Sequence, residues 1–180
     1  KYGKIEDMVL ALECVMPDGT VGWTGRAPRS AMGPDWTQLL LGSEGTLAVF
    51  TAAKLQIHRL PEKRIFMGFA AEELPRAVEF ARRLMQDGLR PAALRIYDPQ
   101  EASLALDSQV LRDCGFPGGA ALVVVFEGPV ALSEAEAETA KRIAGELGLS
   151  HLGPLLGEHW WSHRYNVSYR SEEHTSELQS

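Results

Sequence analysis

The sequence lacks several features that mark specialised protein classes. No stretch of its 180 residues approaches the roughly 20 consecutive apolar residues of a membrane-spanning helix. Lysine and arginine are scattered and the formal net charge is −6, so the basic face of a nucleic-acid-binding protein is missing. There are only two cysteines, Cys14 and Cys114, and their separation fits no metal-ligand spacing. We therefore expect reduced thiols, a cytoplasmic protein, no metal, no nucleic-acid partner and no transmembrane segment.

The composition that remains is that of an ordinary globular protein, with 45% hydrophobic and 23% charged residues. Both ends of the chain are unusual. It opens at Lys1 without methionine, and residues 170–180 match the translation of a common sequencing adapter over eleven consecutive positions. We expect 170–180 to be an artefactual disordered tail and the authentic part to be a fragment cut at both ends.

The first part of the chain predicts short strands joined by turns. Strands are expected over residues 9–16, 20–23 and 48–58, and a short helix over 35–41. The turn signal Pro17-Asp18-Gly19 makes the first two strands a hairpin. Alternation near the end of the last strand places Leu55 and Ile57 inward. A proline within the polar turn at 60–63 is the best internal boundary.

The second part alternates strands with amphipathic helices. Strands are expected over 65–70, 91–97 and 121–126, and helices over 72–87, 99–106, 133–147 and 155–169. Gly88 and Gly148 suit the ends of two helices, and Ser133 with Glu136 fits a capping box. The helix over 72–87 carries an apolar stripe that includes Val78 and Met85. This order predicts an α+β fold with the helices on one face of a sheet.

The stretch Leu41–Thr51, LGSEGTLAVFT, combines a glycine-bounded turn with an apolar run from Leu47 to Phe50 that reads as a buried strand. Glycine permits positive φ and lets a ligand approach the backbone closely. The functional interpretation is a cradle of N–H groups for a phosphate or a flavin edge. The simpler interpretation, favoured by these residues alone, is a plain turn into a core strand.

Arg95 interrupts an apolar strand, where an isolated charge is costly unless it is paired or functional. It either binds a carboxylate or phosphate through its planar fork, or lies on the outward face beside Asp98 or Glu101, and the residues favour the two equally. His159 and His163 are one helical turn apart. A metal site there is weakly indicated, because position 160 is tryptophan where an HExxH motif needs glutamate.

The order KYG, IED, PDG, GPD and GSEGTL is distinctive, and it resembles the FAD-linked oxidase family with its vanillyl-alcohol-oxidase, or PCMH, type of FAD domain. The branch that it resembles most is that of the alkyldihydroxyacetonephosphate synthase-like proteins, on Pro28-Arg29-Ser30, Gly33-Pro34-Asp35, Ala93–Asp98 and Val124–Gly128. The resemblance implies an α+β chain. Residues 1–62 would be the C-terminal portion of a PCMH-type FAD-binding domain, and residues 63–169 the start of an α+β cap, or substrate, domain.

For the site, the resemblance implies FAD as cofactor and places the cofactor contacts at Gly42, Ser43, Glu44, Gly45, Thr46, Leu47 and Ala48. The family usually has glycine at the last of these positions. Because Ala48 leads a strand, we expect its added Cβ to be tolerated. Arg95 aligns with an arginine that the synthase branch needs for activity, which favours a role in binding the substrate's phosphate or ordering the flavin site.

The resemblance also implies a reaction. Synthases of this branch exchange an acyl group for a fatty alcohol on a phosphorylated ketone, a step in ether-lipid formation that uses the flavin without net redox. The alternative is an FAD-linked 2-hydroxy-acid dehydrogenase of the D-lactate or glycolate type, in which Arg95 would hold a carboxylate. A third reading is an inactive folded fragment without bound flavin, because the family's pyrophosphate loop and active-site tyrosine belong outside these residues. Either enzyme would have a small-molecule substrate, and a homodimer stays open.

Overall fold

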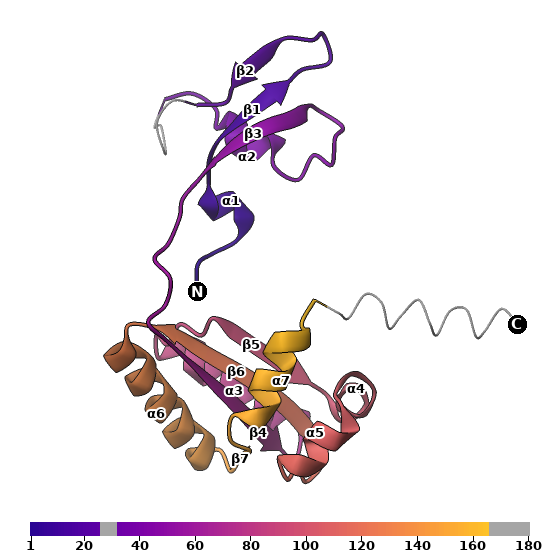
Figure 1. Cartoon of the computed structure of the whole chain (residues 1–180), viewed down its shortest axis with the longest axis vertical. Coiled ribbons are helices and arrows are strands. Elements are labelled where there is room, and N and C mark those ends of the chain that lie inside the picture. The colour runs from indigo at the N-terminus through magenta and orange to yellow at the C-terminus, as the bar shows by residue number, and fades with distance from the viewer. Residues whose placement is uncertain (26–31, 166–180) are drawn as a thin grey trace, which may run out of the picture. The chain divides into compact units, whose positions relative to one another are not determined.

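The computed structural model describes residues 1–25 and 32–165 and forms two compact units, one over Tyr2–Arg59 and one beginning at Leu60 (Figure 1). Each unit is described by itself. The loop arginines Arg26 and Arg29, the Pro28-Arg29-Ser30 segment and the tail at 170–180 lie outside the described residues. Within the described part, no helix is long and apolar enough to cross a membrane.

The first unit is a small three-stranded antiparallel sheet with two short helices. Its elements are α1 (Ile5–Met8), β1 (Val9–Val15), β2 (Val21–Trp23), α2 (Trp36–Leu40) and β3 (Val49–Leu55). β1 lies between β2 and β3. The predicted hairpin turn is confirmed, with Gly19 at φ 84° and the Thr20 N–H donating to the Asp18 carboxylate at 2.9 Å. The core consists of Val9, Leu12, Cys14, Leu40 and Ala48.

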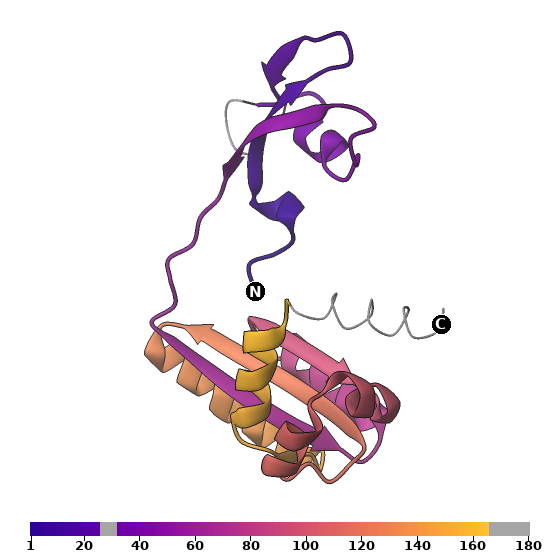
Figure 2. The same ribbon diagram turned by 45° about the vertical axis from the view of Figure 1, so that its right-hand side comes forward.

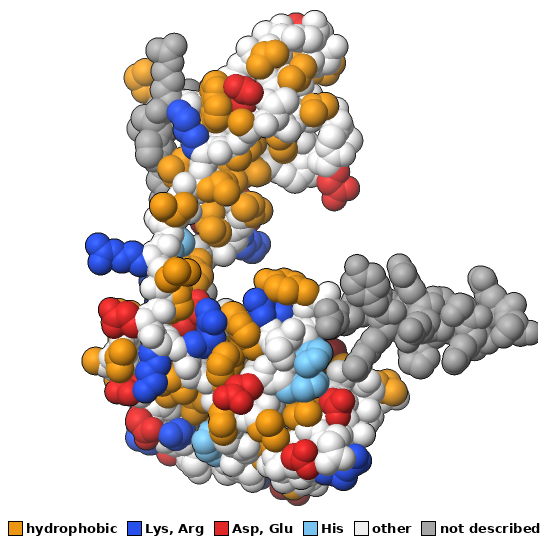
Figure 3. Space-filling model, in the orientation of Figure 1, with side chains coloured by type: hydrophobic (Ala, Val, Ile, Leu, Met, Phe, Trp, Pro, Cys, Tyr) orange, Lys and Arg blue, Asp and Glu red, His pale blue; other side chains and the backbone are white. Residues whose placement is uncertain are grey.

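The prediction of a buried strand after the glycine turn is wrong. Every residue of β3 is exposed, and Val49 keeps 63% of its surface. The inward assignment of Leu55 and Ile57 also fails, and Ile57, at 88% exposed, lies beyond the end of the strand. The reason is that, within the described residues, the five-residue α2 packs on only part of one sheet face, so the side chains of β3 at the sheet edge have little cover. Figure 3 shows hydrophobic side chains on the surface of this unit.

The second unit is a four-stranded antiparallel sheet with the strand order β5-β6-β4-β7. Its elements are β4 (Lys63–Ala71), α3 (Leu74–Gln86), β5 (Ala93–Tyr97), α4 (Pro99–Ala105), α5 (Ser108–Asp113), β6 (Ala120–Gly128), α6 (Val130–Glu146), β7 (Ser150–His151) and α7 (Leu155–His163). Four strands with helices after the first and third, in this spatial order, form the ferredoxin-like split βαβ arrangement. The predicted α+β class is confirmed.

The helices cover both faces of this sheet, not one face as predicted (Figures 1 and 2). Leu122, Val124 and Phe126 of β6 pack with α3 and α6, whereas Val123 and Val125 pack with residues of α4, α5 and α7. All nine residues of β6 are buried. A strand that is apolar at consecutive positions needs cover on both faces, which is the physical reason for the second helix layer.

Two glycines end the long helices as predicted. Gly88 has φ 84°, and the Leu89 N–H reaches back to the Leu84 carbonyl at 3.1 Å. Gly148 has φ 71°, and the Leu149 N–H donates to the Ala144 carbonyl at 2.9 Å. Both ends are Schellman motifs, which require a left-handed residue that glycine adopts most easily.

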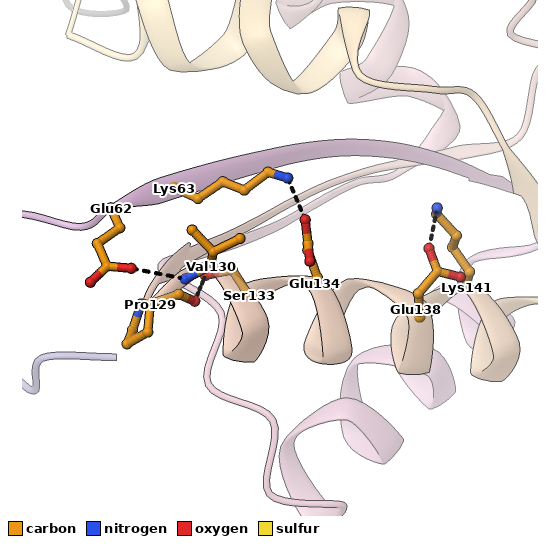
Figure 4. Close-up of polar contacts among 8 residues, drawn as sticks. All are labelled: Glu62, Lys63, Pro129, Val130, Ser133, Glu134, Glu138 and Lys141. Atoms are coloured by element: carbon orange, nitrogen blue, oxygen red, sulfur yellow. Dashed lines mark hydrogen bonds and ion pairs between the residues drawn. The ribbon is translucent and has the colours of Figure 1, made fainter.

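Two predictions about helix details are wrong. α6 begins at Val130, so Ser133 lies inside it with its hydroxyl donating to the Pro129 carbonyl at 3.1 Å, and no capping box forms there (Figure 4). In α3 the buried face is Ala77, Phe80 and Leu84, while Val78 and Met85 are exposed. The Phe80 ring packs against that of Phe69, with centroids 5.0 Å apart and the ring planes tilted by 53°, and this contact orients the helix.

The His151 side chain makes the stability of this unit depend on pH. Its ring lies 5.2 Å from that of Phe69. Partial burial of the ring, with a smaller contribution from Lys141, lowers the pKa of His151, although the residue as a whole is exposed. The unfolded chain then binds a proton more readily than the folded one, so stability is lost as pH falls through the ordinary histidine pKa of about 6.5. We expect the urea midpoint of the unit to drop between pH 7.5 and 5.5. His151→Gln should reduce that drop, and an equal drop in both proteins would contradict the assignment.

Candidate functional site

The turn over Gly42–Ala48 joins α2 to β3 and is held by hydrogen bonds of its own. The Leu40 carbonyl accepts from the Ser43 N–H at 3.1 Å. The Ser43 carbonyl accepts from the N–H of Thr46 at 2.9 Å and from its hydroxyl at 2.6 Å. These bonds define the turn locally, without help from distant parts of the chain.

Three residues of this turn have left-handed backbone conformations. Gly42 has φ 78° and Gly45 has φ 79°, and a Cβ built on either would meet no atom within 4 Å. The glycines are therefore required for conformation rather than for packing against this chain. Between them Glu44 has φ 49° and is the only described non-glycine residue with positive φ. Such a conformation costs on the order of 1 kcal/mol or more and is concentrated at ligand-binding sites.

The turn also presents polar groups without partners. The Ser43 hydroxyl oxygen is buried and has no hydrogen-bond partner among the described residues. The N–H groups of Glu44 and Gly45 donate to no acceptor in the described part of the chain. A hydroxyl without a partner beside N–H groups without acceptors can donate hydrogen bonds to an electronegative ligand edge, such as a flavin carbonyl or ring nitrogen. The residues present thus fit the cofactor that the sequence predicts.

The last two predicted contact residues differ in orientation. Leu47 is 43% exposed, whereas the Ala48 side chain is buried in the core cluster of the unit. Ala48 is not among the described residues with positive φ, so its Cβ is accommodated without backbone strain. Ala48 can therefore meet a ligand only through its backbone.

Arg95 lies on β5, on the sheet face that α7 covers, at the position paired with Val123. Its side chain is 55% exposed, and its Nη2 lies 3.6 Å from Oε1 of Glu101. Its guanidinium carbon sits 5.4 Å from the centre of the Tyr97 ring. The predicted outward neighbour Glu101 is therefore present, and the long, exposed ion pair leaves guanidinium donors available to an anion.

Tyr97 was not singled out in the sequence, but its ring lies against the Arg95 guanidinium. It is 5% exposed, and burial raises the pKa of its hydroxyl while a hydrogen bond with Trp160 acts in the opposite direction. Its signal in the sequence is spacing, since residues two apart on a strand share a face. Tyr97 links the predicted anion site on β5 to α7.

A partly buried ion pair at the end of the sheet was also missed. Glu127 of β6 is 5% exposed and accepts from Nε of Arg64 on β4 at 2.7 Å. The Arg64 guanidinium stacks 4.4 Å from the Trp161 ring centre. The sequence does contain a signal for this pair. Arg64 lies at the start of one apolar strand and Glu127 at the end of another, and antiparallel pairing brings these two strand ends together.

The histidines of α7 stack on one another. The rings of His159 and His163 are 4.2 Å apart, and Nδ1 of His163 lies 2.9 Å from the His159 carbonyl oxygen. The described residues contain no group of three or more histidine, cysteine, aspartate or glutamate side chains suited to a metal ion. The contacts of this pair are thus those of a helix surface.

The predicted site residues fall into two places. Gly42 to Ala48 lie together in one turn of the first unit, and Arg95 lies in the second unit. Residues 60–173 match the family model of FAD linked oxidases, C-terminal domain, which is more than half of the chain. The chain belongs to the FAD-linked oxidases. The family resemblance of the sequence is thereby confirmed.

Several characterised and uncharacterised FAD-linked oxidases are similar to this chain. An uncharacterized FAD-linked oxidoreductase of Escherichia coli K12, YgcU, is 38% identical over 103 residues, 57% of this chain and 21% of that protein. Alkyldihydroxyacetonephosphate synthase of Dictyostelium discoideum is 27% identical and covers 94% of this chain and 31% of its own length. A mitochondrial D-lactate dehydrogenase [cytochrome] of Arabidopsis thaliana is 33% identical over 54% of this chain and 18% of its length.

A solved alkyldihydroxyacetonephosphate synthase has the same fold over nearly the whole chain. The TM-score is 0.78 at 27% identity, over 94% of this chain and 33% of that protein. The chain thus spans between about a fifth and a third of the length of the relatives that it matches.

Proposed function

We propose that this chain is part of an FAD-dependent enzyme that resembles alkyldihydroxyacetonephosphate synthase. Residues 1–62 are the C-terminal portion of the FAD-binding domain, and residues 63–169 are part of the cap domain. The observation that carries the proposal is the turn over Gly42–Ala48, with its orphaned Ser43 hydroxyl, open N–H groups and left-handed Glu44. The similarity to the synthase over 94% of the chain supports it.

In this proposal each site has a distinct task. FAD, when bound, supplies a nucleophilic and electron-accepting ring. The Ser43 hydroxyl donates a hydrogen bond to it, and the N–H groups of Glu44 and Gly45 donate to its electronegative edge. Arg95 binds the anionic group of a small-molecule substrate, a phosphate in a synthase, through the donors that Glu101 leaves available.

A second candidate is an FAD-linked 2-hydroxy-acid dehydrogenase, favoured by the similarity to D-lactate dehydrogenases over about half of the chain. In that case Arg95 would hold a substrate carboxylate. The coverage of 94% by the synthase, against 54% by the dehydrogenase, favours the first candidate. Two assays separate them in a protein of the relatives' length. A synthase incorporates a fatty alcohol without consuming an electron acceptor, whereas a dehydrogenase reduces an acceptor dye with D-lactate.

The turn can be tested through the flavin content. A protein of the relatives' length that contains these residues should bind about one FAD per chain, and the 180 residues alone should be colourless. Gly45→Ala should weaken FAD binding about tenfold, because the new methyl group intrudes where the cofactor approaches and strains the backbone. Flavin absorbance and fluorescence titration measure this.

The matched control is Gly19→Ala in the hairpin of the same unit. Gly19 has φ 84° and, like Gly45, has no atom within 4 Å of a built Cβ. The two variants therefore share the same backbone strain, and they differ in whether the glycine lies in the predicted cofactor-binding turn. Equal losses of flavin would show that the turn is merely structural, and stoichiometric flavin in the 180-residue chain would contradict the expectation for the fragment.

A further inference from the structure

Tyr97 and Arg95 lie on the same face of β5, and the Tyr97 ring is held there by the core of the second unit. The tyrosine belongs to a buried cluster that includes Ala102 of α4 and Ala121 of β6. Trp160 of α7 packs against this cluster. A ring enclosed in this way keeps one orientation, because neighbouring side chains in a packed core leave no room for another rotamer. Tyr97 is therefore a rigid partner for the more exposed Arg95 side chain.

The Tyr97 hydroxyl is the acceptor for two side chains that can only donate. Trp160 and Arg95 both form side-chain hydrogen bonds with it, and these act against the rise that burial causes in the pKa of Tyr97. Because an indole N–H and a guanidinium have no acceptor, the phenol oxygen accepts from both. The guanidinium carbon of Arg95 also lies 5.4 Å from the centre of the Tyr97 ring, within the range of a cation–π contact. Tyr97 thus contacts Arg95 through its oxygen and through its ring.

The position of Trp160 follows from the close approach of α7 to β4. A Cβ built on Gly157 would lie 3.0 Å from the Met67 nitrogen and 3.1 Å from the Phe66 Cβ. Glycine at this position therefore lets the helix lie directly on the strand. Trp160 follows three residues later on the same helix, so this contact sets the distance of its indole from the sheet. The indole N–H reaches the Tyr97 hydroxyl from there.

The carboxylate beside Arg95 is also held by local structure, but it is the weaker of the two contacts. Asp98 caps α4, and its Oδ1 accepts from the Glu101 N–H at 2.7 Å. The Glu101 carboxylate lies 3.6 Å from Nη2 of Arg95, and the two side chains are 45% and 55% exposed. An exposed ion pair of this length restrains an arginine little. The restraint on the Arg95 guanidinium therefore comes mainly from Tyr97.

We infer that Tyr97 is a positioning residue for the anion site at Arg95. An exposed arginine loses rotamer freedom when it binds an anion, and contacts that already restrict the guanidinium reduce that loss. Tyr97 restricts it with an oxygen acceptor and a ring, so the remaining N–H donors keep a constant orientation toward a bound anion. Trp160 acts one step further away, by fixing the Tyr97 hydroxyl. The inference rests on the proposed role of Arg95 in binding the substrate's anionic group.

The restraint itself can be measured in the 180-residue chain without any substrate. Tyr97→Phe keeps the ring and removes the hydroxyl. Nuclear magnetic resonance relaxation of the Arg95 Nε–H group should then give a lower order parameter, because the guanidinium loses its oxygen acceptor. The matched control is Tyr165→Phe, since the Tyr165 ring lies 4.3 Å from the guanidinium carbon of a different arginine, Arg164. The control should leave the Arg95 order parameter unchanged, and the same result for Tyr97→Phe would overturn the inference.

The functional consequence is measured in a protein of the relatives' length, with the phosphorylated ketone or with D-lactate, according to which assay above is positive. Tyr97→Phe should raise KM about three- to tenfold, the effect of one ordinary hydrogen bond, and leave kcat and flavin content unchanged. Trp160→Phe, which removes the indole N–H, should act in the same direction and less strongly. In an Arg95→Ala background Tyr97→Phe should have no further effect, because Tyr97 acts only through Arg95.

The variants separate a failure of this inference from a failure of the proposed function. If Arg95→Ala raises KM while Tyr97→Phe behaves like Tyr165→Phe, the anion site stands and Tyr97 does not position it. An undiminished effect of Tyr97→Phe in the Arg95→Ala background would also overturn the inference, because that effect would come from a general structural change. If Arg95→Ala leaves KM unchanged, the proposed anion site is itself wrong and the inference fails with it. Circular dichroism establishes that each variant is folded.

Discussion

Replacing Gly119 by alanine is expected to destabilise the second unit by roughly 2–5 kcal/mol. Gly119 has φ 82°, and a Cβ there would run into the Ala71 carbonyl oxygen and come within 2.9 Å of the Glu72 carbonyl oxygen. Both obstacles are backbone atoms at the C-terminal end of β4, where Ala71 pairs with Ala120 of β6. Moving either atom would disrupt this pairing. The estimate combines overpacking at about 1–3 kcal/mol with a left-handed alanine at about 1–2 kcal/mol.

Gly118 provides the control, because it has φ 100° and no atom within 4 Å of a built Cβ. Gly118→Ala should cost only the backbone term of about 1–2 kcal/mol. Native-state hydrogen exchange at the β6 amides measures both variants, and it reports this unit without the other. Equal losses at the two positions would mean that the close approach of Gly119 to β4 contributes nothing.

Replacing Arg95 by alanine should lower kcat/KM of a protein of the relatives' length about 10- to 100-fold, mainly through KM. The reason is the loss of a hydrogen bond to a charged group, about 1.5–3 kcal/mol. Arg95→Lys should recover part of the loss, since lysine keeps the charge without the planar fork. Steady-state kinetics with varied substrate concentration measure both effects.

Arg112→Ala is the matched control for Arg95. Arg112 belongs to the same unit, and its guanidinium donates to the Gln109 side chain at 2.8 Å. It should leave kcat/KM within about twofold of the parent, as expected of a surface substitution. If Arg95→Ala behaves in the same way, the arginine is an ordinary surface residue paired with Glu101, and the proposed anion site is wrong.

Much of the fold could be predicted because it depends on short-range signals. Gly88 and Gly148 end their helices because the Schellman motif needs a left-handed residue at that position, whatever packs around it. Asp18 and Gly19 form their turn for a similar local reason. The face of α6 that carries Ala137, Ala140, Ile143 and Ala144 is buried, and the helical spacing of these apolar residues in the sequence indicates that face.

The details that failed depend on partners distant in sequence. The sequence of β3 does not show what packs against the strand, so its apolar residues are predicted to be buried although every residue of β3 is exposed. The rotation of α3 depends on the contact of Phe80 with Phe69, which lies on another element. The partly buried pair of Arg64 and Glu127 arises only when β4 and β6 lie side by side.

By itself the sequence determined the family, the α+β class and the glycine-bounded turn, because each rests on neighbouring residues or on a motif order. Only the tertiary structure decided that helices cover both faces of the second sheet and that the Tyr97 ring lies against Arg95. The tertiary structure also decided the backbone conformation and the hydrogen bonding of the turn over Gly42–Ala48. Residue types show that Gly42 and Gly45 permit positive φ, but only the folded chain shows that Glu44 adopts it and that the Ser43 hydroxyl is buried without a partner among the described residues. Strain and unsatisfied polarity are properties of surroundings, which a linear order of residues does not contain.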